Sequence, residues 1–148
     1  MKTSKQGIEM IKNFEGCRLT PYYCPSGVLT VGYGHTGKDV KVGKKITLKQ
    51  AEKLLKSDLK KFEKHVSSFK SYKWNQNEFD AMVSFAYNIG SINQLTNNGK
   101  RTKIVIAEKM LLYVNSNGKP LNGLILRRKK EHDLFVKGVW KNVSKKNK

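Results

Sequence analysis

The sequence predicts an α+β fold, mostly helical, in which a long helix joins a small β-hairpin lobe to a helical lobe. Strand-forming residues flank a turn early in the chain, at 18–24 and 28–33. Apolar residues then recur at helical spacing in several segments, and the longest of these starts at residue 48. A chain of 148 residues, 38% of them hydrophobic, is long enough to bury one core.

We expect one domain over residues 1–148, without internal repeats or an interdomain linker. The small lobe should cover about residues 15–60. The helical lobe should cover about residues 61–140 and include an N-terminal helix over residues 3–14. The basic residues 141–148 should form a frayed tail.

The N-terminal helix should place an acid at its end. Thr3 or Ser4 can cap the start of this helix, and Gly16 can end it. Glu15 then lies at the negative end of the helix dipole. That position, together with burial in a cleft, favours the protonated carboxyl group that a general acid needs. Without a surrounding motif, Glu15 fits an ordinary exposed residue at a helix end better than a catalytic acid.

The hairpin should begin directly after this helix. Its turn is predicted by Pro-Ser-Gly at 25–27, where proline fixes φ and glycine closes the turn. Cys24 enters the turn and Thr30 leaves it on the returning strand. A hairpin can point both side chains toward a cleft beside Glu15, although Thr30 also fits a strand by propensity alone.

A capping box from Thr47 to Gln50 should start the long helix. Its apolar stripe consists of Leu48, Ala51, Leu54, Leu55, Leu59, Phe62 and Val66. Asn75 and Glu78 mark the start of another helix, whose aromatic and Met stripe we assign to the core.

The remaining elements follow in order along the second half of the chain. Residues 91–103 should form a loop on the substrate side, and residues 104–114 a helix. Residues 115–118 should form a turn before the last long helix over residues 121–136.

Charge and composition restrict the partners. Lys and Arg number 30 against 11 Asp and Glu, which gives a net charge of +19. This charge favours nucleic acid, an anionic membrane or an anionic cell wall, and it also fits a merely solvated basic surface. No apolar run is long enough for a transmembrane helix, and residues 1–15 are too polar for a signal peptide. Two cysteines, Cys17 and Cys24, argue against a disulfide framework. We find no zinc spacing, Walker loop or dinucleotide fingerprint, and therefore expect no metal and no cofactor.

Three motifs stand out in order along the chain. The first consists of Glu15, Gly16, Arg18, Leu19, Tyr22, Gly27, Thr30, Gly32, Tyr33, Gly34 and His35. The second is Ser-Phe-Ala-Tyr-Asn-Ile-Gly at 84–90, and the third runs from Asn117 through Arg127 and Arg128 to Glu131. Together they resemble the phage-type lysozyme family, the muramidases among phage endolysins, over nearly the whole chain. One position departs, because the family pattern has Asp where this chain has Cys24.

The resemblance implies a lysozyme-like fold and a glycoside hydrolase, a peptidoglycan-degrading lysozyme that causes host cell lysis. It would hydrolyse the β-1,4 bond between N-acetylmuramic acid and N-acetylglucosamine. Glu15 would be the catalytic acid, and Cys24 and Thr30 would take the places of the family's water-activating Asp and Thr.

The resemblance also implies supporting residues. By register, Arg127 should pair with Glu15, although a solvated basic face is the alternative for this arginine. His35 should form a structural pair with Asp58 across the lobe.

The role of Cys24 stays open at this stage. A free thiol has a pKa of about 8.5 and is mostly neutral at pH 7, so it is a poorer base than a carboxylate. Cys24 could orient water weakly beside Thr30, act as a thiolate base, or attack the anomeric carbon with retention of stereochemistry. It could also be inert, which would leave the enzyme slow or dead.

Other functions compete with the hydrolase. A lytic transglycosylase needs only one acid, and a cationic wall-binding or membrane-disrupting protein needs no catalysis. Nucleic-acid binding rests on charge alone, because no aromatic-basic platform is present, so we expect no specific nucleic acid. The expected partner is the peptidoglycan glycan strand, bound by a monomer. The expected location is the host cytoplasm until release through a holin-type lesion, and then the cell wall or periplasm.

Overall fold

The structure is a computed structural model, and it describes residues 1–137. The helices are α1 (Lys5–Glu15), α2 (Leu48–Ser67), α3 (Gln76–Ile89), α4 (Asn93–Thr96), α5 (Lys103–Met110) and α6 (Asn122–Lys137), with a 3-10 turn at Lys70–Tyr72. The strands are β1 (Arg18–Tyr23), β2 (Leu29–Gly32), β3 (His35–Thr36), β4 (Asn115–Ser116) and β5 (Lys119–Pro120). The predicted mostly helical α+β fold is confirmed. The predicted tail, 141–148, and the last residues of the helical lobe lie outside the described residues.

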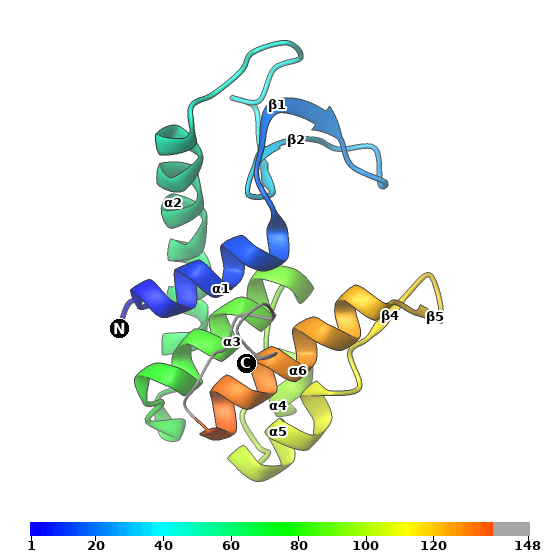
Figure 1. Cartoon of the computed structure of the whole chain (residues 1–148). Coiled ribbons are helices and arrows are strands. Elements are labelled where there is room, and N and C mark those ends of the chain that lie inside the picture. Colours follow the sequence, from blue (N-terminus) through cyan, green and yellow to red (C-terminus); the bar gives the residue numbers. More distant parts are fainter. Residues whose placement is uncertain (138–148) are drawn as a thin grey trace, which may run out of the picture.

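The small sheet and the helices occupy opposite ends of the long helix α2 (Figure 1). The sheet has the order β1-β2-β3 with antiparallel neighbours, and Tyr22 of β1 lies opposite Thr30 of β2. The third strand was not predicted, because a two-residue strand carries no alternating pattern. Gly34 has φ +85°, a left-handed conformation that lets the chain reverse between β2 and β3.

Helix α2 begins as predicted. The Thr47 hydroxyl accepts a hydrogen bond from the Gln50 backbone N–H at 3.1 Å, and the Gln50 side chain accepts one from the Thr47 N–H at 2.8 Å. The predicted stripe is buried at Ala51, Leu55, Leu59 and Val66. Leu48, the first residue of α2, is 53% exposed.

The core of the helical lobe surrounds α3, which packs against α1, α2 and α6. The predicted core stripe on α3 is buried, at Phe79, Met82, Val83 and Ala86. Buried Asp80 of α3 also accepts hydrogen bonds from the backbone N–H and the hydroxyl of Ser4, the residue that caps α1. This contact attaches the start of α1 to α3 and thereby fixes where Glu15, at the other end of α1, lies.

Three local predictions differ from the structure. The expected loop 91–103 contains the short helix α4, because the buried Ile92 and Leu95 anchor this segment in the core. The expected helix 104–114 ends at Met110. The expected turn 115–118 is the tip of a hairpin, since Asn117 and Gly118 both have positive φ, as an Asn-Gly turn between paired strands requires.

Within residues 1–137, no helix is both long and apolar enough to cross a membrane.

Candidate active site

Glu15 is the last residue of α1 and stands where the helical lobe meets the sheet. The Gly16 N–H donates to the carbonyl of Lys12 at 2.9 Å, and Gly16 has φ +67°, so the chain turns out of the helix into β1. The Glu15 side chain is 20% exposed. One carboxylate therefore reaches solvent at the junction of the two lobes.

A cavity of about 290 Å³ opens at this carboxylate. Its lining comes from α1, α2, α3 and the β3 region: Glu15, Gly34, Thr36, Asp58, Lys61, Phe62, Tyr87 and Asn88. Mixed polar and aromatic walls of this kind suit a ligand that carries many hydroxyl groups.

Arg127 of α6 holds one oxygen of Glu15. Its Nη1 donates to Glu15 Oε2 at 2.7 Å, and its Nη2 donates to the carbonyl oxygen of Ser84 at 2.9 Å. The guanidinium also lies 4.8 Å from the centre of the Phe14 ring. Since the Arg127 side chain is only 6% exposed, the ion pair is fixed in one geometry.

A second buried carboxylate supports this arginine. Glu131 is fully buried and accepts from Arg127 Nε at 3.1 Å and from the Ser84 hydroxyl at 2.5 Å. Glu131 also pairs with Arg128, whose guanidinium donates to Asn88 as well. Buried ion pairs are stable only when their remaining hydrogen bonds are satisfied, and this network satisfies them.

The second oxygen of Glu15 faces Gly34 and Tyr87. A Cβ placed at Gly34 would lie 3.2 Å from Glu15 Oε1 and 3.5 Å from the Tyr87 hydroxyl. The Tyr87 hydroxyl donates to the carbonyl of Tyr33 at 2.7 Å. Burial, and secondarily the charge of Glu15, raises the pKa of Tyr87, so this hydroxyl stays protonated. The absence of a side chain at Gly34 therefore leaves Oε1 accessible.

Cys24 and Thr30 lie together in the hairpin. Cys24 Sγ is 3.0 Å from the Ser26 hydroxyl, and the Thr30 hydroxyl donates to the carbonyl of Val28 at 2.9 Å. Neither Cys24 nor Thr30 lines the cavity at Glu15. Both cysteines of the chain, Cys17 and Cys24, are free thiols.

The turn changes the chemistry of the thiol. The hydrogen bond with Ser26, followed by one from the backbone N–H of the turn and a smaller one from Thr30, lowers the pKa of Cys24 to about 7. At neutral pH, Cys24 therefore carries more thiolate than an ordinary cysteine does. This differs from the mostly neutral thiol expected from an ordinary cysteine, because the sequence does not show which hydroxyl groups surround the sulfur.

His35 contacts two carboxylates, Asp58 and Asp39. The contact with Asp58 was predicted, and the contact with Asp39 was not. Nδ1 lies 2.7 Å from Asp58 Oδ2 on α2, and Nε2 lies 3.0 Å from Asp39. Burial alone would lower the pKa of His35, but the hydrogen bonds and charges of Asp58 and Asp39 outweigh it and raise the pKa. This contact fastens the loop after β3 to the long helix.

The structure brings together some predicted residues and adds others. Glu15 meets Arg127 and His35 meets Asp58, whereas Cys24 and Thr30 form a separate pair in the hairpin. The sequence analysis gave no role at the site to the cavity residues Gly34, Thr36, Lys61, Phe62, Tyr87 and Asn88. Gly34 and the pair Tyr87-Asn88 belong to the motifs described in the sequence analysis. Their place in these motifs is the sequence signal that could have identified them as cavity residues. Among residues 1–137, no three His, Cys, Asp or Glu side chains cluster in a way that could hold a metal ion.

A small sheet and a helical lobe, with a glutamate at their junction held by a buried arginine, define a lysozyme-like protein. The chain belongs to the phage lysozyme family, whose model matches residues 12–131.

Relatives in phages cover nearly all of the chain. It is 40% identical to an endolysin of Bacillus phage B103, with 98% of this chain and 58% of the relative aligned. It is 39% identical to an endolysin of Lactococcus phage c2, with 99% and 66% aligned. The endolysin of Salmonella phage P22 is 35% identical and is matched over 99% of its length. The chain thus spans less than two thirds of the Bacillus and Lactococcus phage relatives.

Solved structures have the same fold. An endolysin from Escherichia coli O157:H7 phage FAHEc1 has a TM-score of 0.83 at 37% identity, covering 96% of this chain and 98% of that one. The muramidase domain of SpmX from Asticaccaulis excentricus has a TM-score of 0.81 at 34% identity, covering 91% and 97%. The P1 phage endolysin Lyz has a TM-score of 0.79 in its active form and 0.58 in its secreted inactive form. The present fold is therefore closer to the active form of that protein.

Proposed function

We propose that this chain is a peptidoglycan-degrading endolysin, a muramidase that hydrolyses the β-1,4 bond between N-acetylmuramic acid and N-acetylglucosamine. One observation carries the proposal: Glu15 lies at a cavity between the lobes, with Oε2 held by Arg127 and Oε1 left accessible by Gly34. The endolysin and muramidase names of the relatives and of the solved structures support the same activity.

The proposed reaction begins at Glu15. Protonated at Oε1, the carboxyl group gives its proton to the glycosidic oxygen while the bond from that oxygen to the anomeric carbon breaks. The sugar then has oxocarbenium character, and water or the Cys24 thiolate attacks its anomeric carbon to form the new bond. Arg127 holds Oε2, so Glu15 keeps one orientation through the step.

A second group must direct the attack, and we assign this role to Cys24 with Thr30. A thiol whose pKa is lowered to about 7 is partly ionised at neutral pH, which supports a thiolate base or nucleophile over a purely orienting group. As a base, the thiolate removes a proton from the attacking water. As a nucleophile, it forms a thioglycosyl intermediate that water then hydrolyses.

A lytic transglycosylase is the second candidate. Its supporting observation is that Cys24 and Thr30 do not line the cavity at Glu15. In that reaction Glu15 acts as acid and then base, and the muramic acid's own hydroxyl replaces water at the anomeric carbon. The product then lacks one water.

Location and assembly are part of the proposal. The protein would stay in the host cytoplasm until another protein opens a holin-type lesion, and it would then act as a monomer on glycan strands of the wall. The net charge of +19 supports attraction to an anionic wall.

Purified peptidoglycan tests the assignment of Glu15. The Glu15→Gln variant should lose at least about 100-fold of the rate at which new reducing ends appear, because it has no proton to give. Glu108→Gln is the matched control, since Glu108 is exposed on α5, away from the cavity. A Glu15→Gln variant as active as the control would contradict the proposed function.

A further inference from the structure

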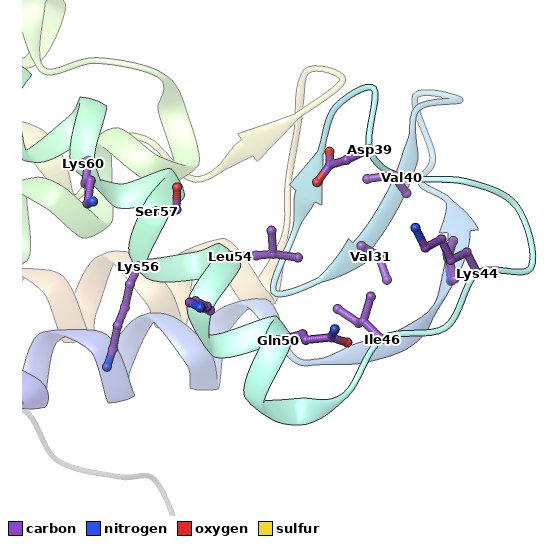
Figure 2. Close-up of a pocket in the computed structure, with 12 residues that line it drawn as sticks. Val31, Asp39, Val40, Lys44, Ile46, Gln50, Leu54, Lys56, Ser57 and Lys60 are labelled. Atoms are coloured by element: carbon purple, nitrogen blue, oxygen red, sulfur yellow. The ribbon is translucent and has the colours of Figure 1, made fainter.

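A larger cavity lies on another side of α2, away from Glu15. It has a volume of about 620 Å³ and lies between α2, the sheet and the loop that follows β3. Figure 2 shows Leu54 pointing from α2 toward Val31 of β2, with Val40 and Ile46 on the loop beside them. These four side chains give the cavity an apolar floor of the size that takes a hydrocarbon chain.

Lysines border this apolar floor. Lys44 comes from the loop, and Lys53, Lys56 and Lys60 come from successive turns of α2. Lys56 and Lys60 also line a neighbouring cavity, together with Lys64 from the next turn of α2. The groove therefore continues along the helix with the same charge.

The lysines of α2 form a regular stripe. Lys49, Lys53, Lys56, Lys60 and Lys64 recur at intervals of three or four residues, so they share one face of the helix. At about 1.5 Å per residue, the stripe is roughly 22 Å long. All five are exposed, and within residues 1–137 none of them forms a salt bridge.

Nearby carboxylates are occupied elsewhere. Asp39 lines the cavity, but both its oxygens lie 3.0 Å from His35 Nε2. Glu52 pairs with Lys12 at 2.7 Å, and Glu63 accepts two hydrogen bonds from Thr3. The charge of Glu52 also acts on Lys56, so the positive charge of the rest of the stripe is left for an external anion.

We propose that this cavity and its lysines are a docking site for anionic phospholipid at a membrane surface. One acyl chain enters the space over Val31, Val40, Ile46 and Leu54, and the phosphate lies against Lys53, Lys56 and Lys60. Lysines hold phosphate at an interface while their methylene stems cover apolar surface. Val42, on the same loop, is 71% exposed and adds apolar surface to that loop.

The site leaves the catalytic cavity open. Asp58 and Phe62 line the cavity at Glu15, and they lie on a different face of α2 from the stripe, at about 100° per residue. A protein docked through the stripe could therefore still accept a glycan strand.

Vesicle binding tests the lysines. The full chain should bind vesicles containing phosphatidylglycerol and not vesicles of phosphatidylcholine alone. Replacing Lys53, Lys56 and Lys60 together by Gln should lower the partition coefficient by about 100-fold, because each cation near an anionic surface contributes about five-fold. The matched control replaces Lys100, Lys109 and Lys119 by Gln, which removes the same charge from exposed positions elsewhere. Equal losses in the two variants would overturn the site, since they would show attraction by net charge alone.

A soluble amphiphile tests the cavity in the unmodified protein. Decyl phosphate below its micelle concentration should shift the methyl resonances of Val31, Val40, Ile46 and Leu54, and inorganic phosphate should not. Unmoved methyl resonances would overturn the acyl-chain site. Binding of a soluble glycerol phosphate polymer as tightly as the vesicles, again with unmoved methyls, would assign the stripe to a polyanion and would also overturn the proposal.

Discussion

The sulfur atom at position 24 is the point on which the proposed chemistry depends. Ser26 and the turn backbone lower the pKa of Cys24 to about 7. If the thiolate removes a proton from water, the cleavage rate should rise with pH through about 7. Cys24→Ser should lose about 10²- to 10⁴-fold in rate, the usual contribution of a general base. Initial rates on peptidoglycan, measured as a function of pH, check both statements.

Cys24→Asp provides the matched test of the same residue. It should remain active, with the rising limb moved toward the ordinary pKa of Asp, about 3.9. Cys17→Ser is the control, because Cys17 packs against the hydrophobic core and lies outside the turn that holds Cys24. If the cleavage rate of Cys24→Ser still rises with pH near 7, a group other than Cys24 is responsible for the pH dependence.

Gly34 is the second residue with a specific prediction. Gly34→Ala should reduce activity at least about 10-fold, because its Cβ would press on Glu15 Oε1 at 3.2 Å. Gly118→Ala is the control for backbone strain, since Gly118 has φ +78° and nothing lies within 4 Å of the added Cβ. Both variants should lose similar stability in thermal unfolding, and only Gly34→Ala should lose most of its rate. Equal rates would contradict the role of Gly34.

Among the elements, α6 supplies the network behind Glu15. Glu131→Gln should destabilise the fold by about 3–5 kcal/mol, because Arg127 and Arg128 would then lack their shared buried carboxylate. Urea unfolding measures this change. Glu108→Gln, an exposed change on α5, should stay within about 0.5 kcal/mol of the original protein. A similarly small effect of Glu131→Gln would show that the network adds little stability.

The contact of His35 with Asp58 and Asp39 makes the joint between the β3 loop and α2 depend on pH. The pKa of His35 is raised, so its stabilisation is complete below the unfolded value of about 6.5 and is lost as pH rises through the folded value. The hydrogen bond from His35 lowers the pKa of Asp39. The stabilisation that the Asp39 carboxylate provides is therefore lost as pH falls below about 4.

The melting temperature of His35→Gln measures this dependence. The difference from the original protein should be largest between about pH 4 and 6.5, and it should shrink as pH rises through the folded pKa of His35. A difference that grows with rising pH would mean that neutral His35 carries the contact.

Local signals predicted the elements that carry their own caps and stripes. Thr47 and Gln50 form the capping box on α2, and Asn75 with Glu78 form the one on α3. The two-residue strand β3 and the one-turn helix α4 were missed, because elements this short are set by tertiary contacts and have no periodicity. The predicted end of α5, residue 114, was also wrong, since the helix ends at Met110 and its end is set by tertiary contacts.

At the scale of the whole molecule, the site joins residues far apart in sequence. Glu15 and Arg127 are separated by 112 positions, and only the family resemblance suggested their contact. No local pattern could show that Gly34 faces Glu15 Oε1. This distance results from packing, and packing depends on the complete fold.

The overall charge predicts a strong dependence on salt. With +19 charges, binding to an anionic wall should weaken steeply as ionic strength rises, because the screening length falls from about 30 Å at 0.01 M to about 3 Å at 1 M. Cleavage of a neutral, soluble glycan oligomer should change little over the same range. Sedimentation with purified wall measures the first quantity, and product formation measures the second. Wall binding that does not change with salt would show that contacts other than charge dominate.

The mass of the products released from purified peptidoglycan tests the central claim most directly. The proposed hydrolase predicts fragments with a hydrated muramic acid reducing end, formed by the original protein and absent with Glu15→Gln. Fragments lighter by one water would contradict hydrolysis and would identify a transglycosylase with Glu15 as its acid and base. Wall binding without any fragments would contradict catalysis altogether.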